Sequence, residues 1–254
     1  VLAMNIINKI KLKLKYFVRK IRVDFLKTSE IDLVIPGEIK NDKFSELIKN
    51  ISSLSSVKTI IEIGSSSGQG STRCFVESIK KRKDAEEVKF YCLELSDPRF
   101  KNLKNYLKSY KFANAYNLSS VETKSFPSEN EIRKFYNERV TLLNSTKLSE
   151  VLRWRKQDID YINSTGRNIC GLEAIKLSNK IDNFDLCLID GSEFTGKAEL
   201  NILIGANYIL LDDTETFKCR EAFEILDNSY EYQQIEYQPN LRNGFAAFKK
   251  IKKA

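Results

Sequence analysis

A glycine-rich motif between an apolar run and a helical pattern is the part of this sequence best suited to hold a ligand. It occupies residues 62–70, EIGSSSGQG, with the spacing E-x-G-x-x-x-G-x-G. The first glycine lets the chain turn sharply, and the later two let backbone approach a ligand because they carry no Cβ. The amides that open the next helix can bind a carboxylate or a phosphate. The residues predicted to bind a cofactor here are Glu62, Gly64, Ser66, Gly68 and Gly70.

A second acidic residue, Glu94, ends the next apolar run, in KFYCLELSDP. An acid at the end of that strand can accept hydrogen bonds from both ribose hydroxyls of a bound nucleoside. Asn117 and Ser119 follow the third run, where they are placed to contact the base. The alternative is that Glu94 is an exposed residue at a strand end with no ligand.

Strand and helix patterns alternate around these residues. Apolar runs rich in β-formers are expected as strands at 57–63, 88–95, 113–118, 184–189 and 208–211, with helices between them. Such alternation predicts a parallel sheet with helices on both faces. Two closing strands, 231–237 and 244–249, are expected to add an antiparallel hairpin. A charged insertion at about 125–166 is helical in pattern, as one long stretch over 128–162.

This plan is an α/β fold with a Rossmann-like, seven-stranded, mostly parallel sheet. Together with the glycine motif it resembles the class I methyltransferases that use S-adenosylmethionine (SAM), more than the nicotinamide enzymes with their G-x-G-x-x-G motif. The resemblance covers residues 57–250. It implies methyl transfer from SAM, with Glu94 as the acid that binds the ribose. Architecture alone does not give function, so the site residues have to carry that argument.

Two further apolar runs end in aspartate, FDLCLIDGSEF at Asp190 and ANYILLDDTETF at Asp212 and Asp213. These strands are neighbours in a methyltransferase sheet, so the three carboxylates are expected to converge. Unpaired, they would repel one another, and a hard divalent cation resolves this. The positions resemble the metal-dependent sugar O-methyltransferases of the macrocin and novobiocin pathways and related domains of glycan-modifying clusters. That resemblance implies Mg²⁺ at the three aspartates and a sugar or glycan acceptor; the alternative is that Asp213 caps the next helix.

The sequence departs from that family at the proton acceptor. Family members often carry D-G-D, whereas this chain has Ser192 in place of the second acid, followed by Glu193. Glu193 is predicted to take over as base beside Asp190 in the catalytic site. Alternatively, a metal lowers the pKa of the acceptor hydroxyl sufficiently by itself.

The insertion contains LRWRKQD, whose Arg153, Trp154 and Arg155 are predicted to grip the acceptor sugar. Packing of Trp154 onto the domain is an equal alternative. Two rival functions also stay open. One is a methyltransferase acting on a protein, a lipid or a small aromatic acceptor. The other is a non-catalytic Rossmann-like docking module.

Composition restricts the chemistry and the partners. The absence of histidine excludes Ser-His-Asp and Cys-His mechanisms and a zinc site with histidine ligands. The five cysteines form no CxxC pair, so we expect reduced thiols and a cytoplasmic location. No apolar run is long enough to span a membrane.

Most of the net charge of +8 comes from residues 1–27, which hold eight Lys or Arg and one acid. We therefore expect a basic N-terminal arm (1–40) before the SAM-binding domain (41–254). The body of the domain is nearly neutral, which speaks against a nucleic-acid partner. The arm is open to three interpretations: a basic amphipathic helix in peripheral contact with an anionic membrane surface, a solvated segment, or an oligomer contact.

Overall fold

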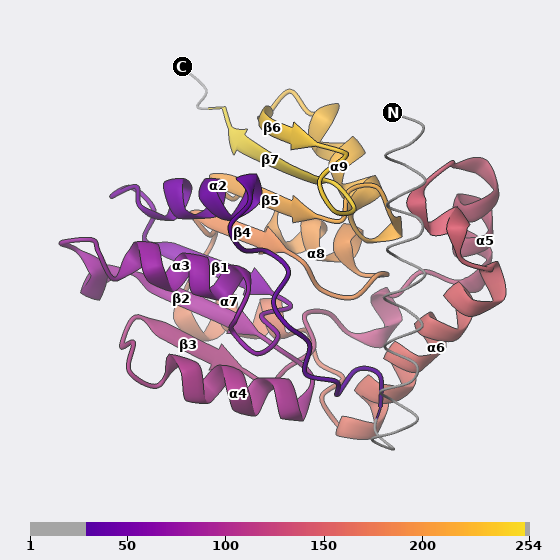
Figure 1. Cartoon of the computed structure of the whole chain (residues 1–254), viewed down its shortest axis with the longest axis horizontal. Helices are drawn as coiled ribbons and strands as arrows, with labels where there is room; N and C mark the ends of the chain where they lie inside the picture. The colour runs from indigo at the N-terminus through magenta and orange to yellow at the C-terminus, as the bar shows by residue number, and fades with distance from the viewer. Residues whose placement is uncertain (1–28, 252–254) are drawn as a thin grey trace.

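A seven-stranded sheet runs through the middle of the computed structural model, which describes residues 29–251 (Figure 1). The strand order is β3-β2-β1-β4-β5-β7-β6; the first five strands are parallel, and β7 is antiparallel to both β5 and β6. The predicted fold class is therefore confirmed. The strands are β1 (Thr59–Ile63), β2 (Lys89–Leu93), β3 (Ala113–Tyr116), β4 (Leu186–Ile189), β5 (Tyr208–Asp212), β6 (Tyr232–Gln238) and β7 (Phe245–Lys250).

Helices cover both faces of the sheet because its central strands are apolar on both sides. In β1, Ile60 faces one core, whereas Ile61 and Ile63 face the other, and all three are buried. The first core is closed by α2 (Lys43–Ser52), α3 (Ser71–Ile79) and α4 (Asp97–Leu107). The second is closed by α5 (Glu129–Glu138), α6 (Leu148–Thr165), α7 (Gly171–Asn179), α8 (Gly196–Leu203) and α9 (Phe217–Asp227).

The chain reverses its direction across the sheet between β1 and β4. From β1 it moves outward to β2 and β3, and then returns to β4 on the other side of β1. In open α/β sheets, ligands bind at the carboxyl ends of the strands at such a switch point. Both the glycine-rich motif after β1 and Asp190 after β4 lie at this edge.

The helical insertion has two helices where the sequence pattern predicts one. Helix α5 ends before Arg139, whose backbone is extended, and α6 begins at Leu148. A short 3-10 turn (Leu142–Ser145) lies between them. Thr141 and Asn144 cap this turn through their side chains, a local interaction that competes with continuous helix. The prediction of one long helix was therefore wrong, although the insertion is helical as expected.

Residues 29–41, here named the strap, cross the carboxyl edge of the sheet before α2 (Figure 1). Gly37 of the strap packs on the loop between β1 and α3, because a Cβ there would lie 2.4 Å from the backbone nitrogen of Gly70. Arg99 of α4 donates from Nε to the Leu33 carbonyl at 2.8 Å. The described part of the predicted arm thus packs against the domain; residues 1–28 and their predicted membrane contact lie outside the described residues.

The strap also connects the domain to the insertion. The Asp32 carboxylate accepts a hydrogen bond from Ser96 Oγ at 3.0 Å, at the start of α4, and one from Tyr161 Oη of α6 at 2.5 Å. Glu30 forms an ion pair with Arg153 of α6 at 3.3 Å. The insertion helix is therefore held beside the edge of the sheet where the predicted site residues gather.

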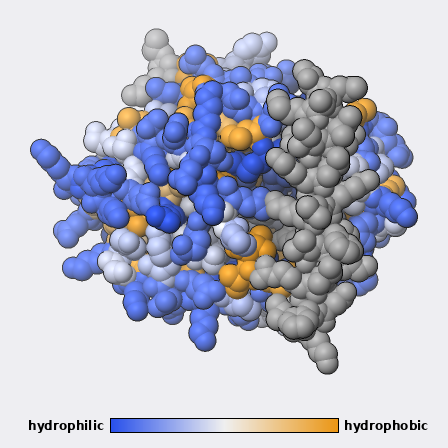
Figure 2. Space-filling view, in the orientation of Figure 1, coloured by the Kyte–Doolittle hydropathy of each residue, from blue (hydrophilic) through white to orange (hydrophobic). Residues whose placement is uncertain are grey.

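The face of the molecule seen in Figure 2 is largely hydrophilic, with hydrophobic residues in small separate patches among the coloured atoms. Within residues 29–251, no helix combines the length and the apolar character needed to cross a membrane.

Candidate functional site

The glycine loop (residues 64–70) connects β1 to α3, and its glycines are required by close contacts. Gly64 has a φ of +79°, and a Cβ on it would lie 2.0 Å from the carbonyl oxygen of Asp190 on the neighbouring strand end. Gly68 has a φ of +81° and lies against the Tyr106 ring. Side chains at either position would be strained in backbone and crowded in space. The loop is thus pressed against the end of β4.

Glu62 holds the glycine loop through buried hydrogen bonds, and its predicted contact with a cofactor stays a prediction. It is fully buried, and its Oε2 accepts hydrogen bonds from Ser65 Oγ at 2.7 Å and Thr72 Oγ1 at 2.6 Å. Burial raises its pKa, which these hydrogen bonds partly offset. Its Oε1 is buried without a hydrogen-bond partner. The side chain fixes the start of α3 relative to β1.

Glu94 lies directly beside the glycine loop. Its Oε2 accepts from the backbone N–H of Ser66 and its Oε1 from that of Ser96, both at 2.8 Å. Burial raises its pKa, while Arg99 and these amides act in the opposite direction. Each carboxylate oxygen has two acceptor positions, so one on each oxygen is left for a ligand hydroxyl. Ser66, whose φ is +49°, also carries a buried hydroxyl without a partner in the loop.

The side-chain donor groups of Asn117 and Ser119 already have partners in the protein. Asn117 Nδ2 donates to the carbonyls of Glu94 and Leu95, both at 2.9 Å. The Ser119 hydroxyl is buried and donates to the Val121 carbonyl at 2.6 Å. Asn117 thus connects the segments that follow β2 and β3, whereas Ser119 holds the loop after β3. A direct contact with a bound base stays a prediction.

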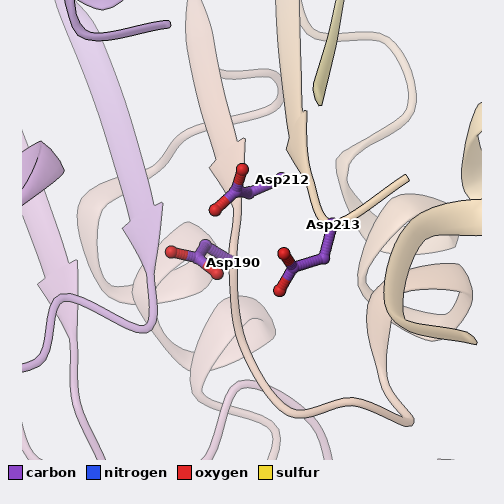
Figure 3. A group of neighbouring side chains, drawn as sticks. All are labelled: Asp190, Asp212 and Asp213. Carbon is purple, nitrogen blue, oxygen red and sulfur yellow. The ribbon is translucent and has the colours of Figure 1, made fainter. Parts of the chain in front are cut away.

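The three predicted aspartates do converge. Asp190 follows β4, Asp212 ends β5 and Asp213 comes next; one carboxylate oxygen from each lies within 4.8 Å of the others (Figure 3). Asp213 has a φ of +58°, a conformation that aspartate tolerates better than most residues. It does not cap α9, because the N-cap is Thr216, so that alternative was wrong. We call these three residues the acid cluster.

Two side-chain cations that the sequence analysis did not assign to the site neutralise part of the acid cluster. Lys218 Nζ, from the first turn of α9, lies 2.8 Å from Asp190 Oδ1 and 2.6 Å from Asp213 Oδ2. Arg242, from the turn between β6 and β7, donates to Asp212 Oδ1 at 2.6 Å and also pairs with the Asp42 carboxylate.

The pKa values within the cluster follow from burial and from these pairs. Burial raises the pKa of Asp190 to about 6 despite the attraction of Lys218, and burial together with Asp213 raises that of Asp212. Burial opposes ionisation of Asp213 too, but Lys218 brings its pKa below the ordinary value. Burial lowers the pKa of Lys218, yet the surrounding carboxylates raise it by more, so this side chain stays an ammonium.

The loop after β4 carries the predicted base, Glu193, and the serine of the altered D-G-D pattern. Glu193 Oε1 accepts the backbone N–H of Phe217 at 3.0 Å, so it holds the start of α9; burial raises its pKa to about 7. The Ser192 hydroxyl donates to Asp158 Oδ2 of the insertion helix α6 at 2.5 Å. A carboxylate therefore does stand beside the position where the family pattern has an acid, supplied from another element.

Arg153, Trp154 and Arg155, predicted to grip an acceptor, all have partners within the protein. Arg153 forms an ion pair with Glu150 at 2.7 Å, in addition to its ion pair with Glu30 of the strap. Trp154 packs against the second core, as the alternative interpretation expected. Arg155 Nε donates to the Pro127 carbonyl at 2.5 Å. Arg153 and Trp154 fasten the insertion to the domain, and Arg155 joins two parts of the insertion. A role of these residues in acceptor binding stays a prediction.

No protein-family model and no curated protein matches this sequence. Similarity is found among solved structures. A protein from Staphylococcus aureus described as a candidate caffeoyl-CoA O-methyltransferase aligns over 92% of this chain and 99% of its own, with 15% identity and a TM-score of 0.51. The cofactor-bound structure of Rv0187 from MTB aligns over 85% of this chain and 83% of its own, with 10% identity and a TM-score of 0.51. This chain has the Rossmann-like methyltransferase fold.

Proposed function

We propose that this protein transfers a methyl group from SAM to a hydroxyl oxygen of a sugar or glycan, with Mg²⁺ at the acid cluster. One observation carries the proposal: Gly64 of the glycine loop lies against the backbone of Asp190, with only 2.0 Å for a Cβ. A cofactor on that loop is therefore adjacent to the carboxylates. Positioning a donor and an acceptor side by side is the larger part of catalysis when the leaving group is already good, as a sulfonium is.

The residues around the glycine loop suit a nucleoside cofactor with a charged amino-acid tail. Glu94 retains one acceptor position on each oxygen, which matches the two ribose hydroxyls. The unpartnered Ser66 hydroxyl offers a further polar contact inside the loop. The N-terminus of α3, at Ser71, presents backbone amides to a carboxylate.

The acid cluster suits a hard divalent cation. Asp190, Asp212 and Asp213 would hold it, and bound Mg²⁺ would orient the acceptor hydroxyl and lower its pKa. Two observations support this. All the ligand atoms are carboxylate oxygens, and Lys218 and Arg242 leave negative charge in excess. Burial is the main cause of the raised pKa of Asp190, and the neighbouring Asp213 carboxylate adds to it.

Methyl transfer also needs a proton acceptor. The S–CH₃ bond breaks as the O–CH₃ bond forms, S-adenosylhomocysteine leaves, and the hydroxyl proton passes to a base. Glu193, with a pKa of about 7, is the base predicted from the sequence. Asp158 is the second candidate, because it lies 2.5 Å from the Ser192 hydroxyl, where the family pattern has its acid. Both carboxylates already accept a hydrogen bond, Glu193 from the Phe217 amide and Asp158 from Ser192, and we favour Asp158 for its place beside the altered position.

Calorimetric titration of SAM, with and without Mg²⁺, tests the cofactor half of the proposal. Wild type should bind saturably, and Glu94→Ala should lose most of that binding. Glu87→Ala is the matched control, since Glu87 has an exposed side chain and its salt bridge to Lys58 lies away from the loop. If folded wild type binds no SAM either with or without Mg²⁺, a SAM-dependent activity is refuted and a docking module is favoured.

The acceptor is tested separately, by measuring S-adenosylhomocysteine release in the presence of Mg²⁺. Methyl glycosides represent the sugar class that we propose, and catechols such as caffeate represent the aromatic class suggested by the Staphylococcus aureus relative. Turnover of the glycosides alone supports the sugar proposal. Turnover of the catechols alone retains the methyltransferase activity and replaces its substrate class.

A further inference from the structure

The ammonium of Lys218 stands between two of the carboxylates that would bind the metal. Its Nζ is 2.8 Å from Asp190 and 2.6 Å from Asp213, and only 11% of the side chain is exposed. A Mg²⁺ ion on the same carboxylates would have its oxygen ligands at about 2.0–2.1 Å. The ammonium and the metal therefore require the same space and the same negative charge.

The backbone of Lys218 is held by close packing, whereas its side chain is held at the ammonium, by Asp190 and Asp213. Gly196 at the start of α8 packs on the Lys218 carbonyl so closely that a Cβ would lie 2.0 Å from that oxygen. The preceding amide, of Phe217, is bound by Glu193. Past Cα, the side chain is a flexible chain of four methylenes that ends in a compact charge. Rotation about these bonds would move the ammonium away from the carboxylates while the backbone of α9 keeps its place.

We propose that Lys218 is an internal competitor of the divalent cation. Its ammonium neutralises Asp190 and Asp213 when no metal is bound and must turn away before a metal can bind there. The affinity of the site for metal is then set by Lys218 as much as by the carboxylates. This inference rests on the metal half of the proposed function and is independent of which acceptor is methylated.

Arg242, the other cation of the site, has contacts outside the acid cluster and is therefore expected to stay in place. It pairs with Asp42 as well as Asp212, and its guanidinium lies 5.5 Å from the centre of the Phe44 ring. Release of Arg242 would break both pairs and the ring contact. Release of Lys218 costs only the pairs that the metal replaces.

The test is calorimetric titration of MnCl₂ and MgCl₂ into SAM-free protein, with thermal unfolding measured alongside. Lys218→Met and Lys218→Gln remove the ammonium; the glutamine amide can still donate to a carboxylate. Lys156→Met is the control, because it removes the same charge from an exposed pair with Asp160 on α6. Removal of a unit charge at this distance from a cation should tighten metal binding by roughly tenfold or more.

We expect both Lys218 variants to bind Mn²⁺ more tightly than wild type, to unfold at a lower temperature without metal, and to regain stability when it is added. Should a variant fold only with Mn²⁺, the recovery of its circular dichroism gives the same support. Metal affinity equal to or weaker than wild type in both variants would overturn the proposal. So would a lack of binding by all four proteins at millimolar metal, even if SAM still binds to wild type and the methyltransferase proposal stands.

Discussion

Replacement of Gly64 by alanine should be among the most destabilising small changes in this protein. Two separate costs arise there. The backbone has a φ of +79°, where a residue with a Cβ is disfavoured by about 1–2 kcal/mol. The new methyl group would also lie 2.0 Å from the Asp190 carbonyl oxygen, so the ends of β1 and β4 would have to separate. Overpacking of this kind adds about 1–3 kcal/mol. We expect a total loss of about 2–5 kcal/mol.

Gly166 allows the two costs to be measured separately. It ends α6 with a φ of +68°, but nothing lies within 4 Å of the Cβ that alanine would add. Gly166→Ala should therefore lose only about 1 kcal/mol, the backbone cost less the gain from a more restricted unfolded chain. Urea denaturation followed by circular dichroism gives both values. Equal losses in the two variants would refute the argument that the glycine loop is pressed against the end of β4.

Three further predictions concern the groups around the acid cluster. Once an acceptor is known, Asp158→Asn should lower kcat by about 10²–10⁴-fold while SAM still binds. Adding Ser192→Asp to that variant should restore part of the lost kcat. An unchanged kcat in Asp158→Asn would exclude Asp158 as the base. Arg242→Met should destabilise the protein by about 3–5 kcal/mol in urea, because Asp212 is left buried without its partner; a loss under 1 kcal/mol would contradict the pairing. Burial raises the pKa of Glu199, so the folded state binds its proton more tightly and stability falls as pH rises above about 4.3. Glu199→Gln should therefore gain stability over wild type as pH increases, and a difference independent of pH would contradict this.

The sequence predicted the parts of the site that lie next to a strand end. The glycine loop, Glu94 and the three aspartates each follow an apolar run, so a parallel sheet places them at one edge wherever the strands pair. The same pattern predicted the alternation of strands and helices and the final hairpin. These features depend on local periodicity, which a single sequence contains.

The partners of those residues could not be predicted, because they come from other elements. Lys218 lies 28 positions after Asp190, and Asp158 lies 34 positions before Ser192. Arg242 belongs to NLRNG, a sequence typical of a turn, which by itself does not point to the acids. Its left-handed backbone, φ +55°, does belong to that turn, but the side chain reaches back to the acids. The break in the insertion was missed because Thr141 and Asn144 oppose helix through side-chain hydrogen bonds, not through proline or glycine.

The link from Asp42 to Arg242 joins residues 200 positions apart. This ion pair therefore connects the start of α2 to the hairpin of β6 and β7, next to the acid cluster. A chain emerging from the ribosome contains all three aspartates before it contains this arginine. Contacts as distant in sequence as that between Asp42 and Arg242 form late because loop closure must precede them. We expect truncated or nascent chains that lack the hairpin to carry Asp212 without its counter-charge. The pairing of this acid would then mark the arrival of the final hairpin at the edge of the sheet.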